Sequence, residues 1–108
     1  MKEPISITAV SSISPLGNTY DSIWNNYLNN HHFITKSDTD LVAELSQESN
    51  LLIEKLRQEN SKYKTLDNSV LYAMYASRLA IKNANWKASD NFGINIGSSR
   101  GATSLFES

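Results

Sequence analysis

Two short β-prone segments, one near each end of the chain, limit what this sequence can fold into. Residues 5–10 are rich in isoleucine and other β-prone residues and run into a turn that contains proline and glycine. Residues 92–97 alternate apolar with small or polar side chains and end in a glycine-rich turn at 97–101. Both patterns are typical of strands that are followed by turns. The sequence therefore predicts strands at 5–10 and 92–97 in an α/β fold.

The sequence between these segments predicts three helices, at about 19–30, 47–60 and 67–85. In the first helix, apolar residues recur once per helical turn, which predicts that they face a core. These residues are Tyr20, Ile23, Trp24, Tyr27 and Leu28. Asn18 or Thr19 is placed to cap this helix by accepting a hydrogen bond from a backbone N–H group.

Other segments leave alternatives open or suggest truncation. Residues 38–40, Asp-Thr-Asp, read as a turn, and residues 41–45 are either extended or helical. Residues 103–107 resemble the start of another helix, so the chain ends about one turn into it. Two strands also make too small a sheet for independent stability. We therefore expect residues 1–108 to be a single truncated domain.

Charge and composition exclude several classes of function. The 108 residues suffice for one domain, and ten basic against eleven acidic side chains give a net charge of -1. We therefore expect no nucleic-acid partner, which would need a basic surface. No apolar run approaches the ~20 residues of a membrane span, and the start shows no signal-peptide pattern. The absence of cysteine excludes disulfides and thiolate metal sites and fits a cytoplasmic protein.

The glycine-rich turn at 97–101 does not complete a nucleotide-binding or hydrolase motif. A Walker A loop needs a lysine after its last glycine, where this chain has Ala102, and the glycine spacing does not match G-x-G-x-x-G. The turn matches the G-x-S-x-G pattern of hydrolases literally, but no histidine follows it and Glu107 is the only later acid. Arg100 and the backbone N–H groups of the turn remain able to hold an anion.

The two histidines do not have the spacing of metal ligands. His31 and His32 are adjacent, so their side chains point in different directions, and positions one helical turn later are Thr35 and Lys36. We therefore predict a solvent-exposed loop there, and neither a metal nor a cofactor.

The first turn and the helix behind it follow a pattern that belongs to one enzyme family. Residues 7–18 resemble I-T-G-x-G-x-x-S/T-P-L/V-G-N, and Trp24 matches the tryptophan of the helix that follows. Ala9 and Ser11 stand where the pattern has glycines, and a positive φ at Ser11 would cost energy.

Two later motifs complete the same pattern in the same order. Residues 66–69, Leu-Asp-Asn-Ser, open the long alanine-rich helix. Residues 93–101 resemble G-x-x-x-G-S/T-x-x-G-G, with Ala102 in place of the last glycine. Together the motifs resemble the N-terminal portion of a β-ketoacyl-acyl-carrier-protein synthase.

The resemblance implies a partial thiolase-like fold, the N-terminal part of one αβαβα half. It implies decarboxylative Claisen condensation of an acyl thioester with malonyl carrier protein, in fatty acid or polyketide-type synthesis. In such synthases the nucleophilic cysteine and two histidines lie beyond residue 108, and His31 and His32 do not match them. No catalytic residue is therefore assigned, and we expect this chain alone to be inactive.

The resemblance also implies a site region and partners. Ser98, Ser99 and Arg100 would border the acyl pocket of the full protein, or they would only cap the helix that follows. The implied partners are acyl carrier protein and the remainder of the synthase, in a homo- or heterodimer. Two alternatives stay open: a non-catalytic subunit that resembles a chain-length factor, and a standalone interaction module.

Overall fold

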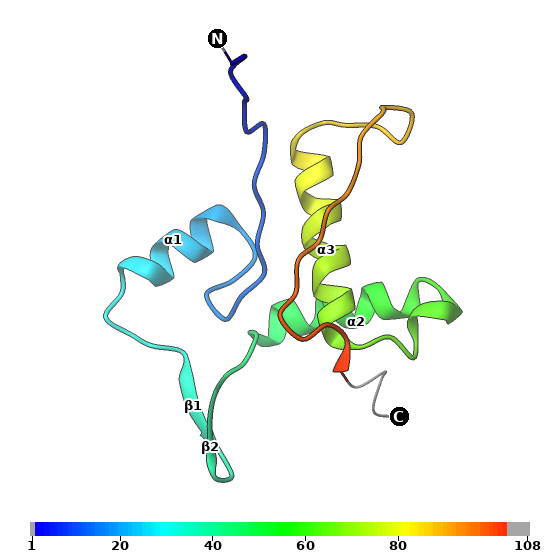
Figure 1. The fold of residues 1–108 in the computed structure, drawn as a ribbon. Helices are drawn as coiled ribbons and strands as arrows, with labels where there is room; N and C mark the ends of the chain where they lie inside the picture. Colours follow the sequence, from blue (N-terminus) through cyan, green and yellow to red (C-terminus); the bar gives the residue numbers. More distant parts are fainter. Residues whose placement is uncertain (1, 104–108) are drawn as a thin grey trace.

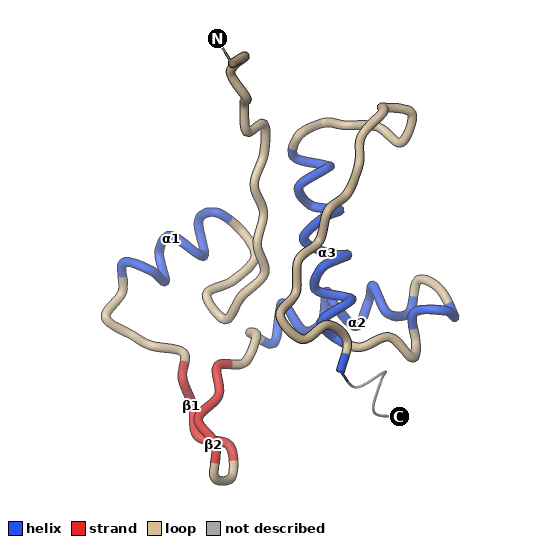
Figure 2. Tube along the Cα trace, viewed as in Figure 1, coloured by secondary structure: helices blue, strands red, loops and turns tan. Residues whose placement is uncertain are grey.

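The computed structural model describes residues 2–103 of the chain. Its elements in chain order are α1 (Tyr20–Leu28), β1 (Ile34–Ser37), β2 (Asp40–Ala43), α2 (Gln47–Gln58), the short 3₁₀ helix η1 (Ser61–Tyr63) and α3 (Asn68–Asn83), as Figure 1 and Figure 2 show. The predicted α/β class and its three helices are confirmed. The helix expected at 103–107 lies almost entirely outside the described residues.

Side-chain caps explain where the helices begin. Thr19 caps α1: its hydroxyl accepts a hydrogen bond from the backbone N–H of Ser22, and the Ser22 hydroxyl accepts one from the N–H of Thr19. Ser46 accepts from the N–H of Ser49 at 3.2 Å and so caps α2. Asp67 caps α3 in the same way. Each cap satisfies a backbone donor that the helix itself leaves unpaired.

The core of the described chain lies between α2 and α3. Ile53 and Leu56 of α2 pack with Leu71 of α3, and Leu71 is 0% exposed. Partly buried side chains surround these three: Ile13, Leu45, Tyr63, Leu66, Tyr72, Met74 and Tyr75. The helices are therefore held by a small apolar cluster to which distant parts of the sequence contribute.

Arg57 fixes the connection between α2 and α3. Its guanidinium donates hydrogen bonds to the backbone carbonyl of Leu66 at 2.8 Å and to the side chain of Asn68, and it pairs with Glu54 at 3.2 Å. A planar group with five donors can satisfy several acceptors at once, which lysine cannot do in the same geometry. Arg57 therefore ties the segment that enters α3 to the last turns of α2.

Much of the chain lies outside this core. The accessible surface is 9247 Å², whereas a compact protein of 12.1 kDa exposes about 6,000 Å². The radius of gyration is 16.4 Å, against about 13 Å for a compact domain of this length. The fold is therefore an open arrangement of elements around α3.

The predicted strands at 5–10 and 92–97 do not form. Both segments are loops, although both run beside α3 in the direction opposite to that helix (Figure 1). A strand needs a neighbour that pairs with its backbone N–H and C=O groups, and within residues 2–103 neither segment has one. Their isoleucine side chains are accordingly uncovered, with Ile5 94% and Ile94 65% exposed.

The residues on both sides of the predicted turn at 38–40 form the antiparallel hairpin β1–β2. Its register pairs Ile34 with Ala43 and Ser37 with Asp40. The turn predicted at 38–40 forms at 38 and 39, and Asp40 already belongs to β2. Asp38 has φ 51, a left-handed conformation that aspartate tolerates in tight hairpin turns. The start of the 41–45 segment is therefore extended.

The prediction that the apolar stripe of α1 faces a core is wrong for the described chain. No residue of α1 is buried, and Tyr20 is 79% exposed. Trp24 and Tyr27 stack on each other, with ring centroids 6.0 Å apart. The spacing correctly predicts the helix, but no described element covers its apolar face.

The small core generates a stability prediction. The Leu71→Ala variant is expected to lose about 2–5 kcal/mol of unfolding free energy, because truncation leaves a cavity between α2 and α3. Urea denaturation followed by far-ultraviolet circular dichroism measures this loss. The matched control is Leu51→Ala in α2, where the side chain is 64% exposed and the expected change is within about 0.5 kcal/mol. Equal losses in both variants would contradict the position of the core.

Candidate functional site

The first motif forms a tight turn at residues 14–17. Ser14 and Gly17 exchange two backbone hydrogen bonds, of 2.9 and 3.1 Å. The Ser14 hydroxyl also accepts a hydrogen bond from the N–H of Leu16 at 3.2 Å. The Pro-Leu dipeptide is thus held at the tip of a closed turn, and Pro15 contributes its fixed φ.

Two asparagine side chains attach this turn to the helices. The Asn18 amide donates to the hydroxyl of Tyr75 in α3 at 2.8 Å, and the Asn26 amide of α1 donates to the carbonyl of Leu16 at 2.7 Å. Asn18 belongs to the sequence motif, whereas the sequence analysis did not single out Asn26. Its signal is its place one helical turn after Ser22, on the face of α1 that meets the turn.

Gly17 occupies a position that admits no side chain. Its φ is 130, and a Cβ atom added there would lie 2.4 Å from the Oγ atom of Ser22. The Ser22 hydroxyl is already engaged in the cap of α1. Glycine is therefore required at this position both by its conformation and by the space available.

Ser11, which replaces a glycine of the family pattern, carries no backbone strain. It is not among the described non-glycine residues with positive φ, which are Asp38 and Asn85. Its hydroxyl instead donates a hydrogen bond to the backbone carbonyl of Ala76 in α3. The replacement thus adds a contact between the first extended segment and α3 that glycine could not make.

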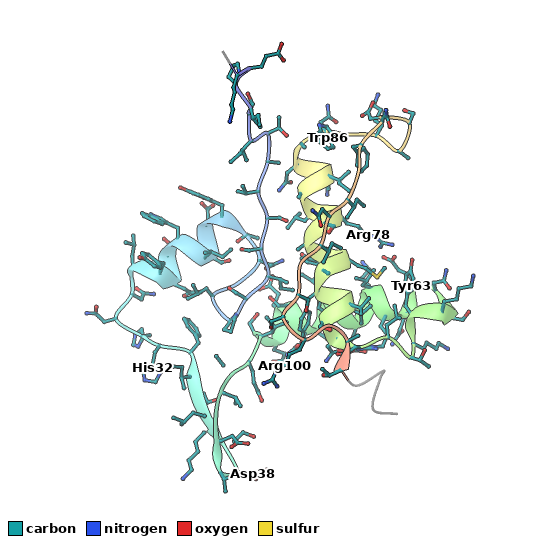
Figure 3. The ribbon with its side chains drawn as sticks, viewed as in Figure 1. His32, Asp38, Tyr63, Arg78, Trp86 and Arg100 are labelled. Atoms are coloured by element: carbon teal, nitrogen blue, oxygen red, sulfur yellow. The ribbon has the colours of Figure 1, made fainter. Side chains whose placement is uncertain are left out.

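The second motif places the three predicted site residues on one exposed turn. Ser98, Ser99 and Arg100 follow the extended segment 92–97, at the end of the molecule where α3 begins (Figure 3). The Ser98 hydroxyl accepts a hydrogen bond from the N–H of Gly101 at 2.9 Å, and Gly101 has φ 69. The structure therefore brings these residues together, and their role at an acyl pocket stays a prediction.

His32 lies at the start of the hairpin, away from both motif turns in sequence. The imidazole of His32 accepts a hydrogen bond from the N–H of Ile34 at 3.3 Å, which places it at the start of β1. Among residues 2–103, no group of three or more histidine or acidic side chains is arranged to hold a metal ion. No helix in that range has the length and apolar character to cross a bilayer. The two motif turns position backbone and neighbouring helices, and they place no general base beside a nucleophile.

Comparison with known proteins finds relatives that share one name. It is similar to 3-oxoacyl-[acyl-carrier-protein] synthase 2 of Staphylococcus aureus, at 33% identity over 113 residues, which cover 94% of this chain and 27% of the relative. The proteins of the same name from strains COL and MSSA476 match at 33% identity over 26% of their length. The chain thus spans about a quarter of the length of these curated relatives. No family model and no solved structure matches it. The likeness to a synthase therefore extends over nearly the whole chain, and it supports in part the resemblance seen in the motifs.

The first turn generates a testable prediction. Gly17→Ala is expected to cost about 1–3 kcal/mol of unfolding free energy, because alanine at φ 130 is strained and displaces the capping hydroxyl of Ser22. Gly93→Ala is the control, since a Cβ there meets nothing within 4 Å. Thermal unfolding measures both variants. If Gly17→Ala is as stable as Gly93→Ala, the geometry assigned to the first turn is wrong.

Proposed function

We propose that this chain is the N-terminal part of a 3-oxoacyl-acyl-carrier-protein synthase. The full enzyme would condense an acyl thioester with malonyl carrier protein, with loss of CO2. One observation carries the proposal: the match covers 94% of this chain but only 27% of the relative. The nucleophilic cysteine and the histidines would come from the remaining part of the enzyme, and this chain alone would be inactive.

The geometry around α3 supports this proposal. The segments 5–10 and 92–97 run in the same direction beside α3 (Figure 1). Parallel strands that are joined through a helix have this relative direction. What the two segments lack is a neighbouring strand, and further chain of the synthase would supply one. The uncovered apolar side chains of both segments would then be buried.

A site region, partners and a location belong to the same proposal. Ser98, Ser99 and Arg100 would border the acyl pocket, since their turn follows one of the two segments that would join the sheet. Acyl carrier protein would deliver the malonyl unit, and the complete enzyme would act as a cytoplasmic homo- or heterodimer. Residues 1–108 would form one part of its synthase domain.

A chimeric enzyme tests the proposed function. This chain replaces the matching segment of the Staphylococcus aureus synthase, and mass spectrometry measures formation of 3-oxoacyl carrier protein. We expect product from the chimera and none from the 108-residue chain alone, because the reacting groups lie in the part of the chimera that comes from the Staphylococcus aureus synthase. A chimera without its nucleophilic cysteine is the negative control. A folded chimera that forms no product would contradict the proposal and favour a non-catalytic subunit.

The same chimera tests the acyl-pocket border. Arg100→Ala is expected to change the preference between acyl chain lengths by about ten-fold, because one methylene group in a pocket is worth that much in discrimination. Lys62→Ala, in the exposed helix η1, is the matched loss of one positive charge. If Arg100→Ala leaves both the rate and the chain-length preference unchanged, Arg100 does not border the pocket.

A further inference from the structure

A hollow between α2 and α3 is lined by no residue of either motif turn, and Tyr75, to which Asn18 donates, is part of its lining. Its volume is about 410 Å³, within the range of sites that hold small molecules. Leu52 and Leu56 of α2 and Leu79 of α3 form an apolar floor. These leucines are half-buried or buried, so the floor is a continuation of the α2–α3 contact.

Three positive side chains and the carboxylate of Glu59 line the rim of the same hollow. Lys55 stands between the two α2 leucines in sequence, and Arg78 and Lys82 flank Leu79 on α3. Residues three and four apart share one face of a helix, so each helix presents an apolar and a cationic side chain to the hollow together. All three cationic residues are exposed, which suits charged heads that stay hydrated above an apolar floor.

Arg78 is fixed in place, whereas the two lysines are available. Arg78 pairs with Glu59 at 2.6 Å and donates to the hydroxyl of Tyr63 at 3.4 Å (Figure 3). Its hydrogen bond to Glu59 raises the pKa of Arg78. Lys55 and Lys82 make no salt bridge within residues 2–103. The hollow therefore offers two positive charges that no described acid neutralises.

The distribution of charge along the chain strengthens this feature. Residues 55–87 contain seven of the ten basic side chains and two of the eleven acidic ones. This stretch forms the end of α2, η1 and α3, and it is basic although the chain as a whole has a net charge of -1. A concentration of one sign of charge around a hollow raises the local concentration of oppositely charged ligands.

We propose that the hollow between α2 and α3 binds a small amphiphilic anion. Its apolar body lies on the leucine floor, and its carboxylate or phosphate head lies at the rim beside Lys55 and Lys82. Burial of the apolar body removes leucine surface from water, and hydrogen bonds between ammonium groups and an anionic head are stronger than neutral ones. This binding is separate from the proposed condensation and requires none of its reacting groups.

Nuclear magnetic resonance titration of the 108-residue chain tests the site. The probes are octanoate and octyl phosphate, with octanol and inorganic phosphate as ligands that lack the head charge or the tail. We expect shifts at the backbone amides of 52–59 and 75–82, and affinity at least about ten-fold weaker for octanol and for inorganic phosphate. The tighter of the two anionic probes identifies the preferred head group. No binding, or shifts that lie elsewhere, would overturn the proposal.

A pair of double variants separates local from general charge effects. Lys55→Gln with Lys82→Gln is expected to weaken octanoate or octyl phosphate binding at least about ten-fold. Lys62→Gln with Lys64→Gln removes the same charge from exposed positions outside the hollow, and we expect less than about a two-fold change because solvent screens distant charges. Circular dichroism confirms that both variants stay helical. Equal weakening in the two variants, or an acidic peptide that binds where the octyl anions do not, would overturn the small-ligand site. The chimera's condensing activity is measured separately. A negative result for the ligand site therefore does not contradict the proposed condensation, and the reverse also holds.

Discussion

The helix α3 is the support on which the rest of this structure depends. Leu71 closes the core against α2, and Arg57 ties the entry of α3 to the same neighbour. From the N-terminal part of the chain, Ser11 donates a hydrogen bond to a backbone carbonyl of α3, and Asn18 donates one to the Tyr75 side chain of the same helix. Since β1 and β2 pair only with each other among the described strands, they cannot organise the chain. Contacts to one helix therefore replace the sheet that usually orders an α/β protein.

Features that depend on local interactions could be predicted from the sequence. Thr19 and Asp67 mark helix starts because their side chains reach N–H groups only two or three residues ahead. The turn at Asp38 is local in the same sense. Local interactions could not decide whether residues 5–10 and 92–97 form strands. They also could not decide whether the apolar face of α1 is covered. The alternating or periodic patterns of these segments report which side chains are suited to burial, but burial needs a partner that the described chain does not supply.

The candidate site also combines local features that the sequence predicts with long-range contacts that it does not. The motif at 14–18 identified Gly17 and Asn18, and the structure gives each a physical task, in avoiding Ser22 and in bonding to Tyr75. The contacts of Arg57 with Leu66 and Asn68 span nine and eleven residues of sequence and follow no repeating pattern. Such contacts depend on the three-dimensional path of the connection between two helices, so they can be identified only from the structure. Short motifs thus locate turns, whereas the side chains that attach those turns to the fold come from the structure.

The area that the chain leaves exposed bears on the choice between the proposed synthase fragment and a standalone interaction module. Its accessible surface of 9247 Å² exceeds that of a compact protein of the same mass by about 3,000 Å². Transient complexes bury less than about 1,200 Å² in total over both partners, whereas obligate interfaces bury roughly 2,000–5,000 Å² or more. The excess on this one chain already falls in the obligate range, and it includes isoleucines on two segments whose backbones lack a neighbouring strand. A small interaction module that associates and dissociates would not be expected to leave so many apolar side chains uncovered, because large exposed apolar patches promote aggregation. The exposed surface therefore supports the proposal that this chain forms part of a larger synthase domain, over the alternative of a standalone module.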